Sequence, residues 1–141
     1  MTQFSRDINA IGHYLRERRR DYMEPLGLKG IHARMIMLIC ENPGCSQERL
    51  SRKMGFDKST IARQVELLED KGFVERRPSE KDKRVLCVYP TEKMEAFYPG
   101  LRDSMDAWDN ELLQELTVEE RQQLTVIMEK IREKIGREVK K

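Results

Sequence analysis

The stretch from Asp57 to Gly72, with the basic segment 76–84 behind it, constrains this chain more than any other part of its sequence. Asp57 is a residue type that caps helix N-termini, and Gly72 suits the left-handed position just past a helix C-terminus. Between them, apolar residues at helical spacing predict one buried face, formed by Ile61, Val65 and Leu68. The remaining face is small, polar and basic, which suits a helix in the major groove of DNA.

The segments on either side of this helix complete a recognisable unit. Ser46 is predicted to cap a short helix that carries Leu50 inward, and Gly55 makes the turn into the next helix. Two short helices joined by a glycine turn form a helix-turn-helix. Residues 73–76 and 85–89 then read as two β-strands around a charged tip. This hairpin is the predicted wing.

The N-terminal part of the chain is predicted to form two further helices. Residues 4–23 place apolar side chains on one helical face, and Pro25 and Gly27 end that helix. Residues 30–42 repeat apolar side chains at three- and four-residue steps before a Pro-Gly pair breaks the pattern.

The C-terminal part is also predicted to be helical. From Met94 to Leu112, apolar residues alternate steps of three and four, a spacing typical of a helix that pairs with another helix. Pro99 lies inside this helix and is expected to kink or split it. Thr117 opens a last helix with capping-box spacing. The apolar face of that helix is formed by Leu124, Ile127, Met128, Ile131 and Ile135.

These elements predict a mainly α fold with a small β-hairpin wing, a winged helix-turn-helix flanked by terminal dimerisation helices. The predicted domains are a dimerisation helix (1–25), a DNA-binding domain (26–91) and dimerisation helices (92–141). The terminal helices carry more apolar surface than one small domain needs, so we expect a homodimer. Burial of these stripes against the central domain is the alternative.

Charge is distributed unevenly along the chain. Residues 46–91 hold eleven Lys and Arg against eight Asp and Glu, residues 92–120 hold two against nine, and residues 121–141 hold seven against three. A basic centre beside an acidic segment predicts a face that binds a polyanion such as double-stranded DNA. An ordinary solvated surface, or a winged-helix module whose wing binds an acidic protein partner, stays open.

The sequence lacks the marks of several other protein classes. It has three cysteines without C-x-x-C spacing, so no disulfide framework is expected. It has neither a leader nor an apolar run long enough to span a membrane, and a cytoplasmic location without membrane contact is expected. No enzyme motif or cofactor fingerprint is present, so an enzyme, a cofactor and a metal site are not predicted. Metal sensing through His13 or His32 with a cysteine or carboxylate is kept as an alternative.

Taken together, these segments resemble the multiple-antibiotic-resistance regulator (MarR) family of winged-helix repressors over nearly the whole chain. The resemblance is carried by residues 46–51, 55–72, 73–76, and 82–84 leading to 90–93. It implies that the terminal helices interlock into a dimer and that the helix after Asp57 enters the major groove. It also implies that Arg84 enters the minor groove, oriented by Asp82.

The chain departs from the family pattern at two places. Lys29 stands where the family usually has a capping Thr or Ser. Without that cap, the start of the second helix is not fixed at this position by the sequence. The first helix lacks the reactive cysteine of the peroxide-sensing members. Cys45, beside a predicted helix N-terminus that would lower the pKa of its thiol, is the one candidate for a redox-sensing alternative.

We predict a sequence-specific regulator, a repressor that binds a pseudo-palindromic operator as a homodimer. Arg63 and Gln64 carry fork or amide groups that can make paired hydrogen bonds to guanine or adenine edges, and Ser59 and Thr60 suit phosphate contacts. The resemblance also implies a crevice for a small effector, predicted to be an aromatic or amphipathic anion near Arg16 and Arg20. The full predicted DNA-contacting set is Ser46, Gln47, Ser59, Thr60, Arg63, Gln64, Arg76, Arg77, Lys81, Asp82, Lys83 and Arg84.

Overall fold

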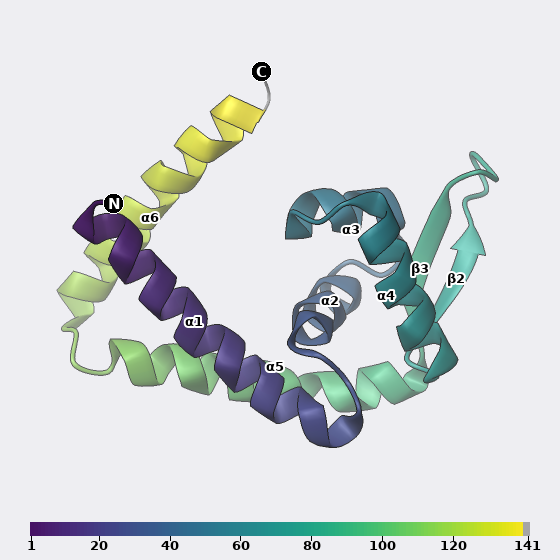
Figure 1. Cartoon of the computed structure of the whole chain (residues 1–141), viewed down its shortest axis with the longest axis horizontal. Coiled ribbons are helices and arrows are strands. Elements are labelled where there is room, and N and C mark those ends of the chain that lie inside the picture. Colours follow the sequence, from purple (N-terminus) through teal and green to yellow (C-terminus); the bar gives the residue numbers. More distant parts are fainter. Residues whose placement is uncertain (140–141) are drawn as a thin grey trace. The chain divides into compact units, whose positions relative to one another are not determined.

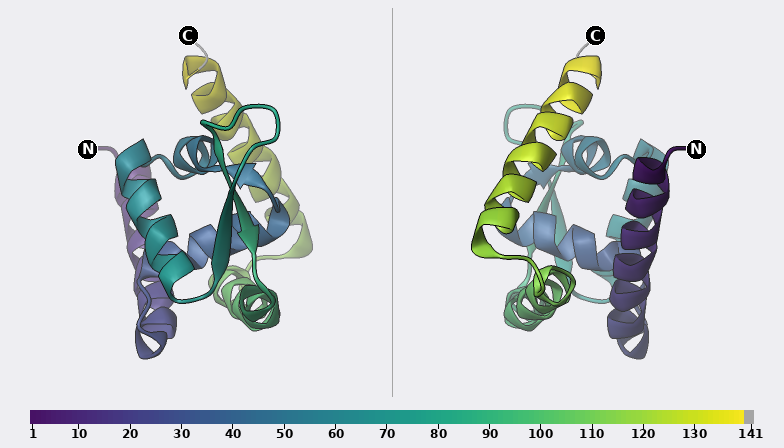
Figure 2. Two further views of the ribbon diagram at one scale, coloured as in Figure 1. Left: turned by 90° about the vertical axis from the view of Figure 1, so that its right-hand side faces the viewer. Right: turned by 90° about the vertical axis from the view of Figure 1, so that its left-hand side faces the viewer.

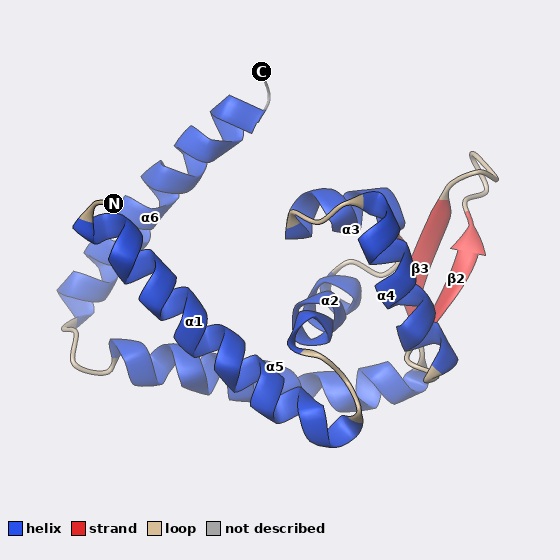
Figure 3. Cartoon of the chain, in the orientation of Figure 1, coloured by secondary structure: helices blue, strands red, loops and turns tan. Residues whose placement is uncertain are grey.

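The structure, a computed structural model, describes residues 1–139, the last three of them by their backbone alone. The chain folds as two compact units, Met1–Met105 and a second that begins at Asp106. Most of it is helical, with one small antiparallel sheet (Figures 1 and 3). The predicted fold class, a mainly α winged helix-turn-helix with terminal helices, is confirmed. No helix among the described residues is long and apolar enough to cross a membrane.

The two predicted N-terminal helices are confirmed. Helix α1 (Gln3–Met23) runs into the 3-10 turn η1 (Glu24–Leu26), and Gly27 follows with a φ of 72° that disfavours residues with a side chain. Helix α2 (Gly30–Glu41) begins directly after Lys29. The missing Thr or Ser cap does not move its start, because His32 Nδ1 accepts the Lys29 backbone N–H at 2.8 Å.

The helix-turn-helix consists of α3 (Gln47–Met54) and α4 (Lys58–Asp70), which we call the recognition helix. Ser46 caps α3, and its hydroxyl accepts the Arg49 N–H at 3.1 Å. Beyond the recognition helix, Gly72 adopts a φ of 82° and donates its N–H to the Glu69 carbonyl, while Phe73 donates to the Leu68 carbonyl. That pair of bonds is a Schellman motif, so the predicted helix end is confirmed.

The wing belongs to a three-stranded antiparallel sheet of order β1-β3-β2, formed by β1 (Cys45–Ser46), β2 (Val74–Pro78) and β3 (Leu86–Pro90). Figure 2 shows the two longer strands running side by side into the loop at the wing tip. The sequence predicted β2 and β3 but not β1. A two-residue strand has too little pattern to detect, and it exists only because Cys45 pairs with Val88 on β3.

The core lies in the first unit, where α2, α3, α4 and the sheet bury their apolar faces together. The residues predicted to point inward from α3 and α4 are buried, with Ile61, Val65 and Leu68 fully inaccessible to solvent. Helix α5 (Glu92–Leu113) adds Met94 and Leu101 to the same core. The core therefore holds the recognition helix in place from behind, while its other face stays open.

Helix α5 is continuous through Pro99, so of the two expected outcomes, a kink or a split, the split does not occur. Proline removes one backbone hydrogen bond, but Met94 and Leu101 are buried in the core on either side of it. In the second unit, α6 (Val118–Val139) starts at a capping box. Thr117 Oγ1 accepts the Glu120 N–H at 3.1 Å, and the Glu120 carboxylate accepts the Thr117 N–H at 2.9 Å.

Candidate DNA-binding surface

The recognition helix begins with a network of short hydrogen bonds. Asp57 Oδ1 accepts the Thr60 backbone N–H at 2.7 Å and the Ser59 hydroxyl at 2.8 Å. The bond from the Thr60 N–H, followed by those of the Thr60 and Ser59 side chains, lowers the pKa of Asp57 to about 2. Asp57 therefore stays ionised at neutral pH, where it caps the helix and orients the two hydroxyls that were predicted to contact phosphate.

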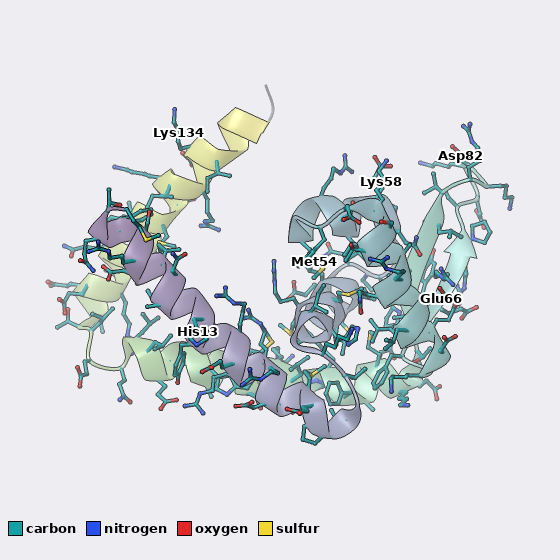
Figure 4. The ribbon with its side chains drawn as sticks, in the orientation of Figure 1. His13, Met54, Lys58, Glu66, Asp82 and Lys134 are labelled. Carbon is teal, nitrogen blue, oxygen red and sulfur yellow. The ribbon has the colours of Figure 1, made fainter. Side chains whose placement is uncertain are left out.

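Arg63 is exposed on the recognition helix, and its Nη2 donates to Thr60 Oγ1 at 3.4 Å. The alternative, an ion pair with Glu66 on the same helix, does not occur within the described chain. Lys58 lies at the start of this helix (Figure 4), 3.8 Å from the carboxylate of Glu48 on α3. Because Arg63 makes no ion pair with Glu66 in the described part of the chain, most of the five donors of its guanidinium are available to a bound ligand.

Gln64 is half-buried and turned toward α2. Its Oε1 lies 2.8 Å from Nε2 of His32, a side chain with no solvent exposure. This contact was not predicted. It means that the amide predicted to read bases through both of its polar atoms already has one of them engaged inside the domain.

The two arginines of β2 are paired in different ways. The Arg76 guanidinium binds Glu69 Oε1 at 2.9 and 3.2 Å, and the Arg76 N–H donates to Glu69 Oε2, so the wing is tied to the recognition helix. These bonds lower the pKa of Glu69. Arg77 pairs with the exposed Glu75 at 3.0 Å and lies 4.4 Å from the Tyr89 ring centre. Arg76 is thus more enclosed than a phosphate-binding residue was expected to be.

Asp82 and Arg84 form a two-pronged ion pair at the wing tip. Asp82 accepts Arg84 Nε and Nη2, each at 3.1 Å, and the Arg84 N–H at 3.0 Å. These bonds lower the pKa of Asp82. The Arg84 side chain is nevertheless 91% exposed, and the neighbouring Lys81 and Lys83 are exposed as well. Figure 4 places Asp82 at the far end of the hairpin. The tip therefore presents three cations, one of them held in a fixed direction.

A hollow of about 230 Å³ brings two of the predicted residues, Gln47 and Arg84, together with Lys58, which was not predicted. It is lined by Gln47 from the start of α3, Lys58 from the recognition helix and Arg84 from the wing. Gln47 Oε1 is buried in this region and has no hydrogen-bond partner among the described residues. By contrast, Gln64 and Arg76 are held by partners of their own. The predicted residues therefore differ in exposure: Arg84 is paired but exposed, whereas Gln64 and Arg76 are bonded to other elements and partly buried.

The structure corrects the expectation for Cys45. Its thiol is buried in β1, and burial raises its pKa, an effect larger than the opposing influence of Arg49. The neighbouring helix N-terminus does not offset this loss of solvation. Burial likewise raises the pKa of Cys40, to about 11. The thiolate premise behind the redox-sensing alternative was wrong.

Two residues that organise this surface were missed from the sequence. Glu69 was not singled out, although it lies seven residues before Arg76 and across a turn that folds back. His32 was considered only for metal sensing and not as a hydrogen-bond partner of Gln64. The signal that identifies it is its place at the third position of α2, where a capping-box acceptor is expected after Lys29.

Comparisons with known proteins match this geometry. A family model described as the MarR family matches residues 26–85. A Bacillus subtilis protein named as the HTH-type transcriptional regulator YybA is 30% identical over 138 residues, covering 98% of this chain and 92% of its own length. A Clostridium symbiosum protein named as the HTH-type transcriptional regulator BilQ is 36% identical over 96 residues, covering 68% of this chain and 67% of its own length.

A solved structure from Listeria monocytogenes, described as a MarR family regulator complexed with a 26mer DNA, is 27% identical. It superimposes with a TM-score of 0.90, covering 98% of this chain and 92% of the other. The similarity includes the terminal helices as well as the winged helix-turn-helix. This chain therefore belongs to the MarR family and is a DNA-binding transcriptional regulator, not an enzyme.

Proposed function

We propose that this protein is a cytoplasmic repressor that binds a pseudo-palindromic operator as a homodimer and releases it when a small anion binds. The observation that carries the DNA-reading part is the exposed Arg63, placed on a capped recognition helix beside a wing whose tip holds Arg84 against Asp82. A guanidinium in a major groove suits guanine, and a second one suits a narrow, electronegative minor groove.

The homodimer is supported by apolar side chains that the single chain leaves exposed. On α1 these include Phe4 and Ile11, at 55% and 47% exposure, and on α6 they include Ile127 and Ile135, at 55% and 57%. Large aliphatic side chains in regular rows rarely stay in water in a stable protein. A second copy related by two-fold symmetry would cover these side chains with the same surface. The same symmetry would place two recognition helices against two half-sites of the operator.

Selection of bound fragments from random DNA tests the DNA-reading proposal. We expect one enriched pseudo-palindrome. Arg63→Ala should weaken binding to it by ~1–3 kcal/mol and relax the preference at one base position. Lys83→Ala is the matched control, because this exposed cation should weaken all sequences alike and lower the salt slope by about one. Recovery of unrelated sequences from the unmodified protein would point instead to a winged helix that binds an acidic protein.

The anionic effector is supported by a cavity of about 620 Å³ in the first unit. The predicted Arg16 and Arg20 line it, together with Lys29, Arg34 and the apolar side chains of Ile31 and Phe56. A lining that combines more cations than carboxylates, the latter being Glu17 and Glu24, with apolar side chains suits an aromatic carboxylate. Because the cavity joins α1 to the start of α2, a ligand there favours one placement of the recognition helix over another.

A titration of aromatic carboxylates against the operator complex tests the effector proposal. We expect release of the unmodified protein and a weaker response from Arg16→Gln. Arg6→Gln is the control, since Arg6 is exposed on the same helix and does not line the cavity. Equal responses from both variants would place the ligand elsewhere, and DNA that is never released would identify a constitutive DNA binder.

A further inference from the structure

His32 is a buried polar side chain placed between two elements that matter for DNA binding. It lies in the first turn of α2 with no solvent exposure, and both of its ring nitrogens are engaged. Nδ1 accepts the backbone N–H of Lys29 at 2.8 Å, and Nε2 lies 2.8 Å from Gln64 Oε1 on the recognition helix. One ring therefore joins the start of α2 to the middle of the recognition helix.

The first of these bonds fixes the tautomer of the ring. A backbone N–H only donates, so Nδ1 of His32 must present a lone pair to Lys29. A neutral imidazole then carries its proton on Nε2, and Nε2–H donates to Gln64 Oε1. The backbone at the start of α2 thereby determines which end of the Gln64 amide faces inward.

The ring is also held in its neutral form. Burial lowers the pKa of His32, and the charges of Lys29 and Lys71 act in the same direction, while the hydrogen bond with Gln64 acts against them. A proton on Nδ1 would face the Lys29 N–H directly and would place a positive charge at a helix N-terminus. At neutral pH the lone pair on Nδ1, and with it the orientation of Gln64, is preserved.

We infer that His32 is a positioning residue for DNA recognition, which holds the Gln64 amide with its oxygen inward and leaves its amino group as the hydrogen-bonding group offered to DNA. Gln64 is half-buried rather than fully enclosed, and its Nε2 has no hydrogen bond to another described residue. The inference rests on the proposed role of the recognition helix. It replaces the expected two-pronged contact with adenine by a single donor contact.

The chemistry of base edges gives this inference a specific consequence. An amino group seeks an acceptor, which in the major groove means guanine N7 or O6, adenine N7 or thymine O4. The inward oxygen no longer meets the adenine or cytosine amino group. At the position that Gln64 contacts, the operator should therefore favour a base with an accessible acceptor and discriminate against cytosine, whose major-groove group is a donor.

Three variants compared by binding to a library of single-base operator variants test the inference. His32→Gln keeps an acceptor and a donor in a side chain that does not titrate, so the base preference should be retained. His32→Leu fills the space without either group, and the preference at that one position should fall on the order of tenfold. Gln64→Glu still accepts from His32 but has no donor to offer, so it should lose the same preference.

The outcomes separate this inference from the proposed function. If the unmodified protein discriminates among operators but a folded His32→Leu gives the same base profile, His32 only fills the core and the inference is overturned. Should His32→Leu fail to fold, Gln64→Glu decides, because an unchanged profile there overturns the inference as well. If the unmodified protein shows no base preference and Arg63→Ala changes nothing, the proposed DNA-reading function itself has failed.

Discussion

The winged helix-turn-helix and the terminal helices use apolar residues in opposite ways. In the first, Ile36, Leu50 and Leu68 are at most 1% exposed and close a core within one chain. In the second, Val126 and Ile127 of α6 are more than half exposed although their helix is equally regular. Helical periodicity alone does not reveal which stripe is covered by the chain itself. The winged region closes its core within one chain, whereas the exposed apolar side chains of α6 form the surface that the proposed second copy would cover.

The DNA-binding surface also contains carboxylates that hold neighbouring side chains in place. Around the DNA-binding surface, Asp57, Glu69 and Asp82 each hold a neighbouring donor in a defined direction. Side chains that are already oriented lose less conformational freedom when a ligand binds. The side chains of the winged region are therefore preorganised for DNA binding.

The comparison is tested most strongly by a charge on the apolar stripe of α6, at Ile131, which is half-buried in the single chain. We expect a dimer at micromolar concentration and a monomer for Ile131→Asp by sedimentation, because an unpaired carboxylate would be buried between the copies. A monomer has only one recognition helix to bind the operator, so operator binding should weaken by about 10²- to 10⁴-fold. Gln122→Asp is the control. Gln122 lies nine residues before Ile131, which is about two and a half helical turns, so it is on the opposite face of α6. A monomeric unmodified protein would refute the dimer.

Truncation of one apolar side chain in each region gives the next largest effect. In the Ile131→Asp background, Leu50→Ala should lower the free energy of unfolding by about 2–5 kcal/mol, because it empties a closed core. Ile127→Ala in the same background should change it by no more than about 0.5 kcal/mol, since that side chain is in water. Urea unfolding measures both. Equal losses would mean that the terminal unit has a closed core of its own.

The tie between the recognition helix and the wing should have a smaller effect. Arg76→Gln removes charged hydrogen bonds to the partly buried Glu69 and should lower the free energy of unfolding by about 1 kcal/mol. Arg77→Gln, at the adjacent residue, breaks an exposed pair with Glu75 and should lower the free energy of unfolding by less than Arg76→Gln does. If urea unfolding gives the reverse order, the Glu69 contact does not hold the wing.

Local rules predicted the parts of this molecule that depend on neighbours in sequence. Asp57 and Gly72 bound the recognition helix as predicted, because caps depend on only a few adjacent residues. Strand β1 was missed because it is defined by its partner Val88, far along the chain. The split that was one expected outcome at Pro99 does not occur, because a propensity rule takes no account of tertiary packing on both sides of the proline.

The candidate site was predicted as a set of residue types but not as a set of partners. Arg63 and Arg84 have the exposure that their types and positions led us to expect. Gln64 and Arg76 do not, because their partners His32 and Glu69 lie on other elements. Periodicity places a residue on a helix face, but it does not show which polar group of another element will be its hydrogen-bond partner.

The smallest expected effect concerns the cap of the recognition helix and appears only in acid. The folded-state pKa of Asp57, about 2, lies below its ordinary value of 3.8, so the stability it contributes is complete above pH 3.8 and is lost as the pH falls through 2. Asp57→Asn keeps a capping side chain without a titrating group. Urea midpoints measured from pH 4 to pH 2 should therefore fall more steeply for the unmodified protein than for Asp57→Asn. Parallel curves would show that the ionised carboxylate adds nothing beyond an ordinary cap.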